Sequence, residues 1–149
     1  MKALSLRQPH CEAILSGGMD VINRYQPASY PGDILIHASK TIDPAHRTKV
    51  KRLNLRTGGI VGMVEIVDCV EQSESIWFDG PYGLVLQNPR PIPFIECKGD
   101  RNFFNPSDIR RPVIQMILRK EITHEMAEQI LGLYPHQVRN EVFQMERYG

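Results

Sequence analysis

Apolar and polar residues follow strand-like patterns through the first two thirds of the chain. The stretch 60–70, IVGMVEIVDCV, is the strongest, because it alternates or stays apolar throughout. Gly62 interrupts this stretch, which predicts a bulge or a close backbone approach. The other strands predicted in the first half are 3–6, at an edge of the sheet, 21–24 and 34–38.

The region after Trp77 predicts further strands of uneven character. Residues 82–87 are typical of a strand, whereas 88–93 contain three prolines. Proline cannot donate a hydrogen bond to a neighbouring strand, so 88–93 is expected at an edge rather than in the middle of a sheet. Residues 94–97 are expected to pair again, which gives about six short strands in all.

Two helices are expected between the early strands. Pro9 suits the first position of a helix that the glycine pair at 17–18 ends. Asp43 and Pro44 predict the N-cap and the first residue of a basic helix that runs to about Leu55. The strand order is therefore interrupted twice by helices before the long apolar stretch begins.

Apolar residues return at helical spacing in the last third of the chain. One helix is expected near 107–119, and Thr123 is the expected N-cap of a second. A third helix is expected through the apolar positions Val138, Val142 and Met145.

These strands with inserted and appended helices predict an α+β fold built on a small, mixed, barrel-like sheet. We expect residues 1–104 to form the barrel domain and residues 105–149 to form a helical C-terminal extension packed on the same domain. With 149 residues, 42% of them hydrophobic, the chain is long enough for one domain with a core of its own.

The cysteines and the missing motifs exclude several classes of protein. Cys11, Cys69 and Cys97 show no CxxC spacing and no nearby pair of histidines, which argues against a disulfide scaffold or a zinc module. The start of the chain lacks the apolar core of a signal peptide, and no apolar run approaches a membrane span. No GxGxxG, phosphate-loop or HExxH motif is present. We therefore expect a cytoplasmic protein with no membrane segment, no metal and no cofactor.

The net charge of +1 conceals an uneven distribution. Residues 1–36 sum to zero, and residues 61–149, with nine basic and thirteen acidic residues, sum to −4. Residues 37–60 carry six basic residues against Asp43 alone, a net charge of +5. This basic segment (residues 37–60) could contact phosphate groups, or its charges could form an ordinary solvated helix face.

Several blocks of sequence occur in a recognisable order. They are ALSLRQP at 3–9, ILSG at 14–17, NR at 23–24, YPG at 30–32, ILIHASK at 34–40, GIVGMVEIVDC at 59–69 and NPR at 88–90. Together, in this order, they resemble the ASCH domain of the PUA-like superfamily. The resemblance covers about residues 3–104. It implies a small PUA-like β-barrel with a cleft, a fold used for RNA recognition. Some relatives are amidohydrolases of acetylated cytidine nucleosides, and a ribonuclease activity has been proposed for others.

The chain departs from the family pattern after the first predicted helix. Met19 stands where the resemblance implies a lysine, and Ile22 stands where it implies a carboxylate or hydroxyl; Arg24 remains. A desolvated lysine beside a carboxylate can transfer protons or activate a hydroxyl, which methionine and isoleucine cannot do. Losing both avoids an unpaired buried charge. No catalysis by this pair is therefore expected.

The remaining polar residues of the family blocks are candidates for contacts with nucleic acid. They are Arg7, Gln8, His10, Arg24, Tyr25, His37, Ser39, Lys40 and Lys98. Arginine, lysine and glutamine can donate to phosphates or base edges, and the aromatic rings can stack on bases. Structural roles stay open: an ion pair for Arg7, backbone capping for Gln8, plain packing for Tyr25, hydrogen-bonded burial for His37 and a solvated charge for Lys98. His10 stands where relatives commonly have tryptophan.

Glu65 is the first candidate if a catalytic acid survives. By strand alternation it shares a face with Met63 and Val67, and if buried it would need Arg24 or Lys40 as a partner. The favoured hypothesis is a protein that binds RNA or another single-stranded nucleic acid, or a nucleoside, in the barrel cleft without catalysis. The alternatives are a hydrolase of modified nucleosides or RNA that uses Glu65 or His37, and a protein-binding adaptor that acts through the C-terminal helices.

Overall fold

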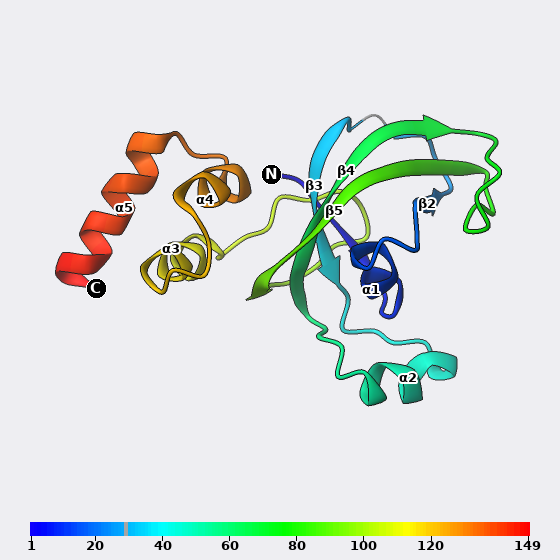
Figure 1. The fold of residues 1–149 in the computed structure, drawn as a ribbon, viewed down its shortest axis with the longest axis horizontal. Coiled ribbons are helices and arrows are strands. Elements are labelled where there is room, and N and C mark those ends of the chain that lie inside the picture. The colour runs from blue at the N-terminus through cyan, green and yellow to red at the C-terminus, as the bar shows by residue number, and fades with distance from the viewer. Residues whose placement is uncertain (29) are drawn as a thin grey trace.

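A five-stranded mixed sheet forms the centre of the computed structural model, which describes residues 1–28 and 30–149 (Figure 1). The sheet has the order β1-β3-β4-β5-β2 in the described residues; β1 pairs parallel with β3, and the other neighbours are antiparallel. The strands are β1 (Ala3–Leu6), β2 (Val21–Arg24), β3 (Gly32–Ala38), β4 (Gly59–Val70) and β5 (Tyr82–Glu96).

Helices lie on both sides of the curved sheet, as the predicted α+β fold requires (Figure 1). Helix α1 sits within the curve of the sheet, α2 projects from one end of it, and α3, α4 and α5 gather on the side away from α1. They are α1 (His10–Leu15), the 3-10 turn η1 (Pro44–His46), α2 (Arg47–Arg52), α3 (Arg110–Leu118), α4 (His124–Leu131) and α5 (Pro135–Tyr148). No helix in the described ranges is long and apolar enough to cross a membrane.

Strand alternation divides the buried side chains into two cores, one on each face of the sheet. The inner core is enclosed by the curve of the sheet and α1, and it contains Leu4, Ile36 and Val64. The outer core joins the opposite face of the sheet to the C-terminal helices, and it contains Leu35 and Met63. The apolar strand 34–38 is thus buried on both faces, which explains its nearly continuous apolar sequence.

The three C-terminal helices share the outer core with the sheet. Val113 of α3, Ala127 of α4 and Val138 of α5 are fully buried in it. Thr123 caps α4 as predicted, since its hydroxyl accepts a hydrogen bond from the amide of Met126 at 3.1 Å.

Gly62 occupies a position that only glycine fits, as its place in an apolar strand predicted. The register of β4 against β5 shifts between Ile60 and Gly62. A Cβ at Gly62 would lie 2.7 Å from the carbonyl oxygen of Arg90 and would overlap the side chain of Leu15 on α1. The missing side chain therefore lets α1 and β5 approach β4 closely.

The prediction of about six short strands is wrong, because 82–96 forms one long strand, β5. Register shifts and a left-handed Asn88, with φ of 56°, let the strand continue past its prolines. Strand β2 pairs with residues 82–85, so among the described residues the proline-containing part of β5 has β4 as its one strand neighbour. That part is therefore a local edge, as the prolines predicted.

Three predicted helix boundaries are also wrong. Pro9 is the N-cap of α1 rather than its first residue, and the helix predicted near 107–119 begins only at Arg110. The helix predicted to reach Leu55 is a 3-10 turn followed by α2, which ends at Arg52 because Asn54 takes a left-handed conformation, with φ of 52°. Asp43 makes no side-chain cap at η1 and pairs with an arginine instead.

Candidate nucleic-acid interface

The inside of the curved sheet is packed with apolar side chains where a polar pair was expected. Met19 is 7% exposed and Ile22 is 2% exposed, and both belong to the inner core with Ile14 and Leu84. Neither residue lines either of the cavities described below. The position that the family pattern reserves for a lysine and its partner is therefore part of the core.

A groove of about 1090 Å³ lies on the other face of the sheet, and we call it the outer groove. It is formed by the ends of β1, β3 and β5, by the 97–101 segment and by the start of α3. The groove brings together four of the predicted contact residues. These are His37, Ser39, Lys40 and Lys98.

His37 lies at the floor of the outer groove and is only 2% exposed. Its Nε2 is 2.8 Å from the carbonyl oxygen of Cys97, and its Nδ1 is 2.9 Å from Oγ of Ser5. A carbonyl oxygen only accepts, so Nε2 carries the hydrogen, and Nδ1 of the neutral ring accepts the hydrogen of the Ser5 hydroxyl. The edge of the ring also meets Phe104, with ring centres 5.7 Å apart. His37 thus has the hydrogen-bonded, buried character that was one of its two predicted roles.

Charges of both signs surround the outer groove. Lys40, Lys98 and Arg101 lie on its rim and are exposed. Three carboxylates, from Glu96, Asp100 and Asp108, line it as well. The groove itself is therefore close to neutral, and any excess of positive charge comes from the five basic residues of the basic segment other than Lys40.

The six basic residues of the basic segment are all exposed. Its one acidic residue, Asp43, forms an ion pair with Arg7 from outside the segment. Within residues 1–28 and 30–149, none of the six forms a salt bridge. The positive charge of the segment is therefore not neutralised by neighbouring carboxylates, and it projects with α2 from the end of the sheet (Figure 1).

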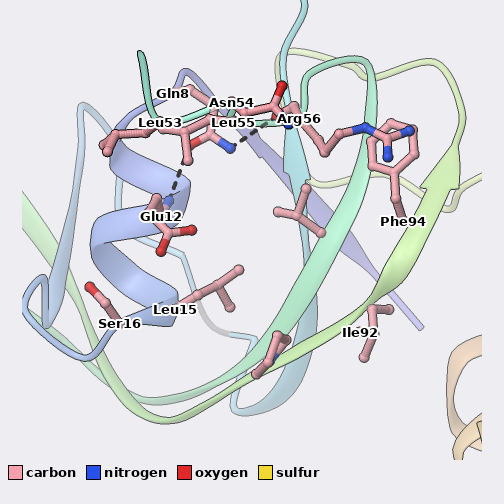
Figure 2. A pocket seen from close by; sticks show the side chains of 12 residues that line it. Gln8, Glu12, Leu15, Ser16, Leu53, Asn54, Leu55, Arg56, Ile92 and Phe94 are labelled. Atoms are coloured by element: carbon pink, nitrogen blue, oxygen red, sulfur yellow. Dashed lines mark hydrogen bonds between the residues drawn. The ribbon is translucent and has the colours of Figure 1, made fainter. Parts of the chain in front are cut away.

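A second cavity of about 570 Å³, the α1 pocket, lies between α1, the 53–56 loop and β5 (Figure 2). On its far side the guanidinium of Arg56 stacks on Phe94, with its central carbon 4.0 Å from the ring centre. Arg56 lines this pocket and Gly58 lines the outer groove, so the two cavities open on neighbouring parts of one loop.

Gln8 joins α1 to that loop. Its Nε2 donates to the carbonyl oxygen of Arg56 at 3.0 Å, and its Oε1 accepts from the amide of Glu12 at 3.1 Å (Figure 2). Because the side chain is buried and both ends of the amide bind backbone, Gln8 has the capping role that was its structural alternative.

The other predicted contact residues lie outside both cavities. Arg7 forms an ion pair with Asp43, which is the structural role left open for Arg7. The ring of His10 lies 6.2 Å from that of His46 and 6.5 Å from that of Trp77, centre to centre. These residues are not brought together with the outer groove.

Arg24 and Tyr25 lie at the far end of β2. Arg24 packs over the ring of Phe103, 5.8 Å from its centre. Tyr25 is 91% exposed, so the alternative of plain packing is wrong for this ring. Both side chains reach solvent. They lie outside the basic segment and outside both cavities.

Glu65 lies half-buried on β4, opposite Asp33 and Gln87 in the strand register. Since Glu65 is not fully buried, the condition under which it would need Arg24 or Lys40 is not met. In the described part of the chain Glu65 forms no salt bridge, and the Lys40 side chain lies against Gly58. No group of three or more histidine, cysteine or acidic residues in that part could hold a metal ion.

Ser5 was not predicted as part of the site. It stands directly opposite His37 because β1 and β3 pair in parallel with Ser5 in register with His37. The local sequence of 3–6 shows only an apolar strand, so no signal in it indicates this neighbour. Only the pairing of two strands separated in the sequence reveals it.

Two of the cysteines are held as thiols. Burial raises the pKa of Cys11 to about 12, and burial also raises the pKa of Cys97. A thiol of raised pKa is a poor nucleophile at neutral pH. Neither cysteine therefore supplies the interface with a reactive group.

No protein-family model matches the chain, and no curated protein matches it. Among solved structures, the chain is similar to the crystal structure of ASCH from Zymomonas mobilis, with 18% identity and a TM-score of 0.45 over 75% of this chain and 77% of that chain. It is also similar to a tyrosine-to-phenylalanine mutant of that protein, with 18% identity and a TM-score of 0.44 over 75% of this chain and 79% of that one. A serine-to-alanine mutant of the same protein gives 19% identity and a TM-score of 0.43 over 64% and 72%. At these values the similarity assigns no role to any residue of this chain.

Proposed function

We propose that this protein binds single-stranded RNA on its outer surface, along the outer groove and the adjoining basic segment. The observation that carries the proposal is that Ser39, Lys40 and Lys98 line one groove beside a segment of unneutralised positive charge. The inner core is packed with apolar side chains, so we place the RNA on the outer surface rather than inside the barrel, where the sequence had suggested it.

The basic segment supplies the phosphate contacts. Lys49, Lys51 and Arg52 are exposed on α2, and each can neutralise a phosphate and release the counterions condensed on it. This term does not depend on base sequence, so it gives affinity and orientation rather than specificity. It makes binding weaken steeply as salt is added.

The cavities beside the segment favour a single strand over a duplex. Unpaired bases can turn into cavities and stack on guanidinium or aromatic planes, whereas the bases of a duplex are already stacked on one another. Arg56 is exposed and its guanidinium already lies over the ring of Phe94, so it is positioned for such a stack. The outer groove, only two residues further along the same loop, accommodates the next part of the strand.

The test is fluorescence anisotropy with a labelled oligouridine at several salt concentrations. We expect the Lys40→Ala and Lys98→Ala variants, and a variant with Lys49, Lys51 and Arg52 all changed to alanine, to bind more weakly. Each lost phosphate contact should reduce the slope of log affinity against log salt by about 0.7. Lys120→Ala is the matched control, because this exposed lysine follows the far end of α3.

Unchanged affinity in all three groove and α2 variants would contradict the proposal. So would binding that ignores salt, or duplex RNA that competes as well as the single strand does. A DNA oligonucleotide of the same length measures how far the 2′-hydroxyl contributes.

A further inference from the structure

We infer that Ser5 and His37 form a nucleophile and base pair that hydrolyses short-chain carboxylic esters at the floor of the outer groove. This activity goes beyond RNA binding and requires no RNA. The residues lie on the face of the sheet opposite Met19 and Ile22, because Leu4 and Ile36, their neighbours in sequence, belong to the inner core. The pair is therefore separate from the position that the family pattern reserves for chemistry.

The hydrogen bonds around His37 orient the pair for proton transfer. The carbonyl of Cys97 accepts from Nε2, which fixes the ring with its hydrogen on that nitrogen. The lone pair of Nδ1 is then directed at the Ser5 hydroxyl, 2.9 Å away. A nucleophile bonded to a base, with the base held by a third group, is the arrangement that activates a serine. Here a backbone carbonyl takes the place that a carboxylate takes in serine hydrolases.

Ser5 is accessible from the groove, while His37 is shielded. Ser5 is half-buried and lines the cavity, whereas His37 is buried beneath it. The backbone of Gly99 crosses the pair so closely that a Cβ there would lie 2.6 Å from Cε1 and 2.8 Å from Nδ1 of His37, and would overlap Oγ of Ser5. Glycine at this position keeps the pair intact, and because its backbone lies close to Oγ, we expect the site to favour a small acyl group.

The chemical step is an ordinary acyl transfer. Oγ of Ser5 bonds to the carbonyl carbon of the ester while its proton moves to Nδ1 of His37. The bond from that carbon to the alcohol oxygen then breaks, and the departing alcohol takes the proton from Nδ1. Water repeats the sequence on the acyl-serine, giving the free acid and restoring the Ser5 hydroxyl. Ester and water are consumed, and acid and alcohol are produced.

The test uses the full chain with a tagged fluorophosphonate and with p-nitrophenyl acetate. The fluorophosphonate should attach to Oγ of Ser5 with loss of fluoride, and peptide mass spectrometry should locate it there. Folded protein should react, and protein unfolded in urea should not. p-Nitrophenyl acetate should be hydrolysed, and the prior fluorophosphonate reaction should abolish that hydrolysis.

Variants separate the pair from its surroundings. Ser5→Ala should lose labelling and hydrolysis, while Ser73→Ala, at an exposed serine that lines neither cavity, should keep both. His37→Gln should slow labelling by about 100-fold or more. Ser5→Ala keeps the bond between His37 and Cys97, so it reports on the proposal even if His37→Gln fails to fold. Labelling that survives Ser5→Ala, or that is no faster in folded than in unfolded protein, would overturn the inference whatever the result for RNA.

Discussion

The ionisation of Cys11 is coupled to folding. Its side chain is fully buried against β1 and β3, and its Sγ lies 3.3 Å from the carbonyl oxygen of Leu6 and 3.8 Å from that of His37. Burial disfavours the thiolate and raises the pKa of Cys11 from the ordinary value of 9.0 to about 12. The folded state therefore keeps a proton that the unfolded state releases.

This difference predicts that stability falls as the pH rises through the range between the two pKa values. The folded state binds more protons there, so the free energy of unfolding decreases with pH. The Cys11 contribution to this decrease should be about 1 kcal/mol between about pH 8 and pH 10. Urea unfolding at these pH values measures it, with Cys11→Ala as the comparison. The variant should lose less stability over this range than the wild type does, and parallel pH dependences would contradict the assignment.

Gly62 makes a second prediction at the scale of one residue. In Gly62→Ala the new Cβ meets a backbone carbonyl, of Arg90, that cannot move without disturbing the sheet. We expect a loss of about 1–3 kcal/mol in the free energy of unfolding. Gly18→Ala is the matched control, because its Cβ would find nothing closer than the Ala13 carbonyl oxygen at 3.7 Å. Equal losses in the two variants, measured by urea unfolding, would contradict the explanation that Gly62 is needed for the close approach of the backbone.

Residues whose role follows from their own chain neighbours could be predicted, and residues whose role depends on distant pairing could not. Gly62 was identified because a glycine inside an apolar strand indicates a bulge or a close backbone approach. Ser39 and Lys40 were identified as contact candidates from the polar end of the block 34–40, and both line the outer groove. Ser5 was missed because its partner is found only through the parallel pairing of β1 with β3. The stack of Arg56 on Phe94 was missed for the same reason, since the two residues come from a loop and a distant strand.

At the scale of elements, β5 shows that prolines in a sequence do not always mark the end of a strand. Its prolines were correctly associated with an edge, but they do not end the strand. The short β2 covers only the first part of β5, so one continuous strand is central at its start and an edge further on. A strand can therefore change its environment along its length. A sequence pattern then predicts several separate strands where the structure has one.

Helix α4 provides a prediction at this scale, because its start depends on one side chain. Thr123→Ala removes the hydroxyl that accepts from the amide of Met126, and it should lower the free energy of unfolding by about 1 kcal/mol. Thr123→Ser keeps the acceptor and should be close to wild type. Urea unfolding followed by far-UV circular dichroism distinguishes them, and equal losses in the two variants would exclude the cap as the cause.

At the scale of the whole molecule, the sheet is shared by two cores, and this arrangement limits what the C-terminal helices can do. The apolar residues of α3 and α4, such as Ile114 and Ile130, are already buried in the outer core with Leu35 of β3. The terminal amine of Met1 adds a hydrogen bond to the carbonyl of Ile130 at 3.3 Å. These apolar faces are thus occupied within the chain, so an adaptor role would have to use the outer side of α5, where Phe143 and Tyr148 are exposed.

Sharing the sheet predicts that the helices and the barrel unfold together. Ile114→Ala should remove about 2–5 kcal/mol by leaving a cavity in the outer core. Because β3 contributes Leu35 to that core and Ile34 and Ile36 to the inner one, the loss should reach Trp77, which packs against the inner core. Trp77 fluorescence reports the barrel, and circular dichroism is dominated by the helices. In the variant both signals should shift to lower urea concentration and remain coincident.

The control is Gln129→Ala, on the exposed side of α4, which should change the free energy of unfolding by no more than about 0.5 kcal/mol with either signal. Helical signal lost before any change in Trp77 fluorescence would instead show that residues 105–149 unfold as a separate unit.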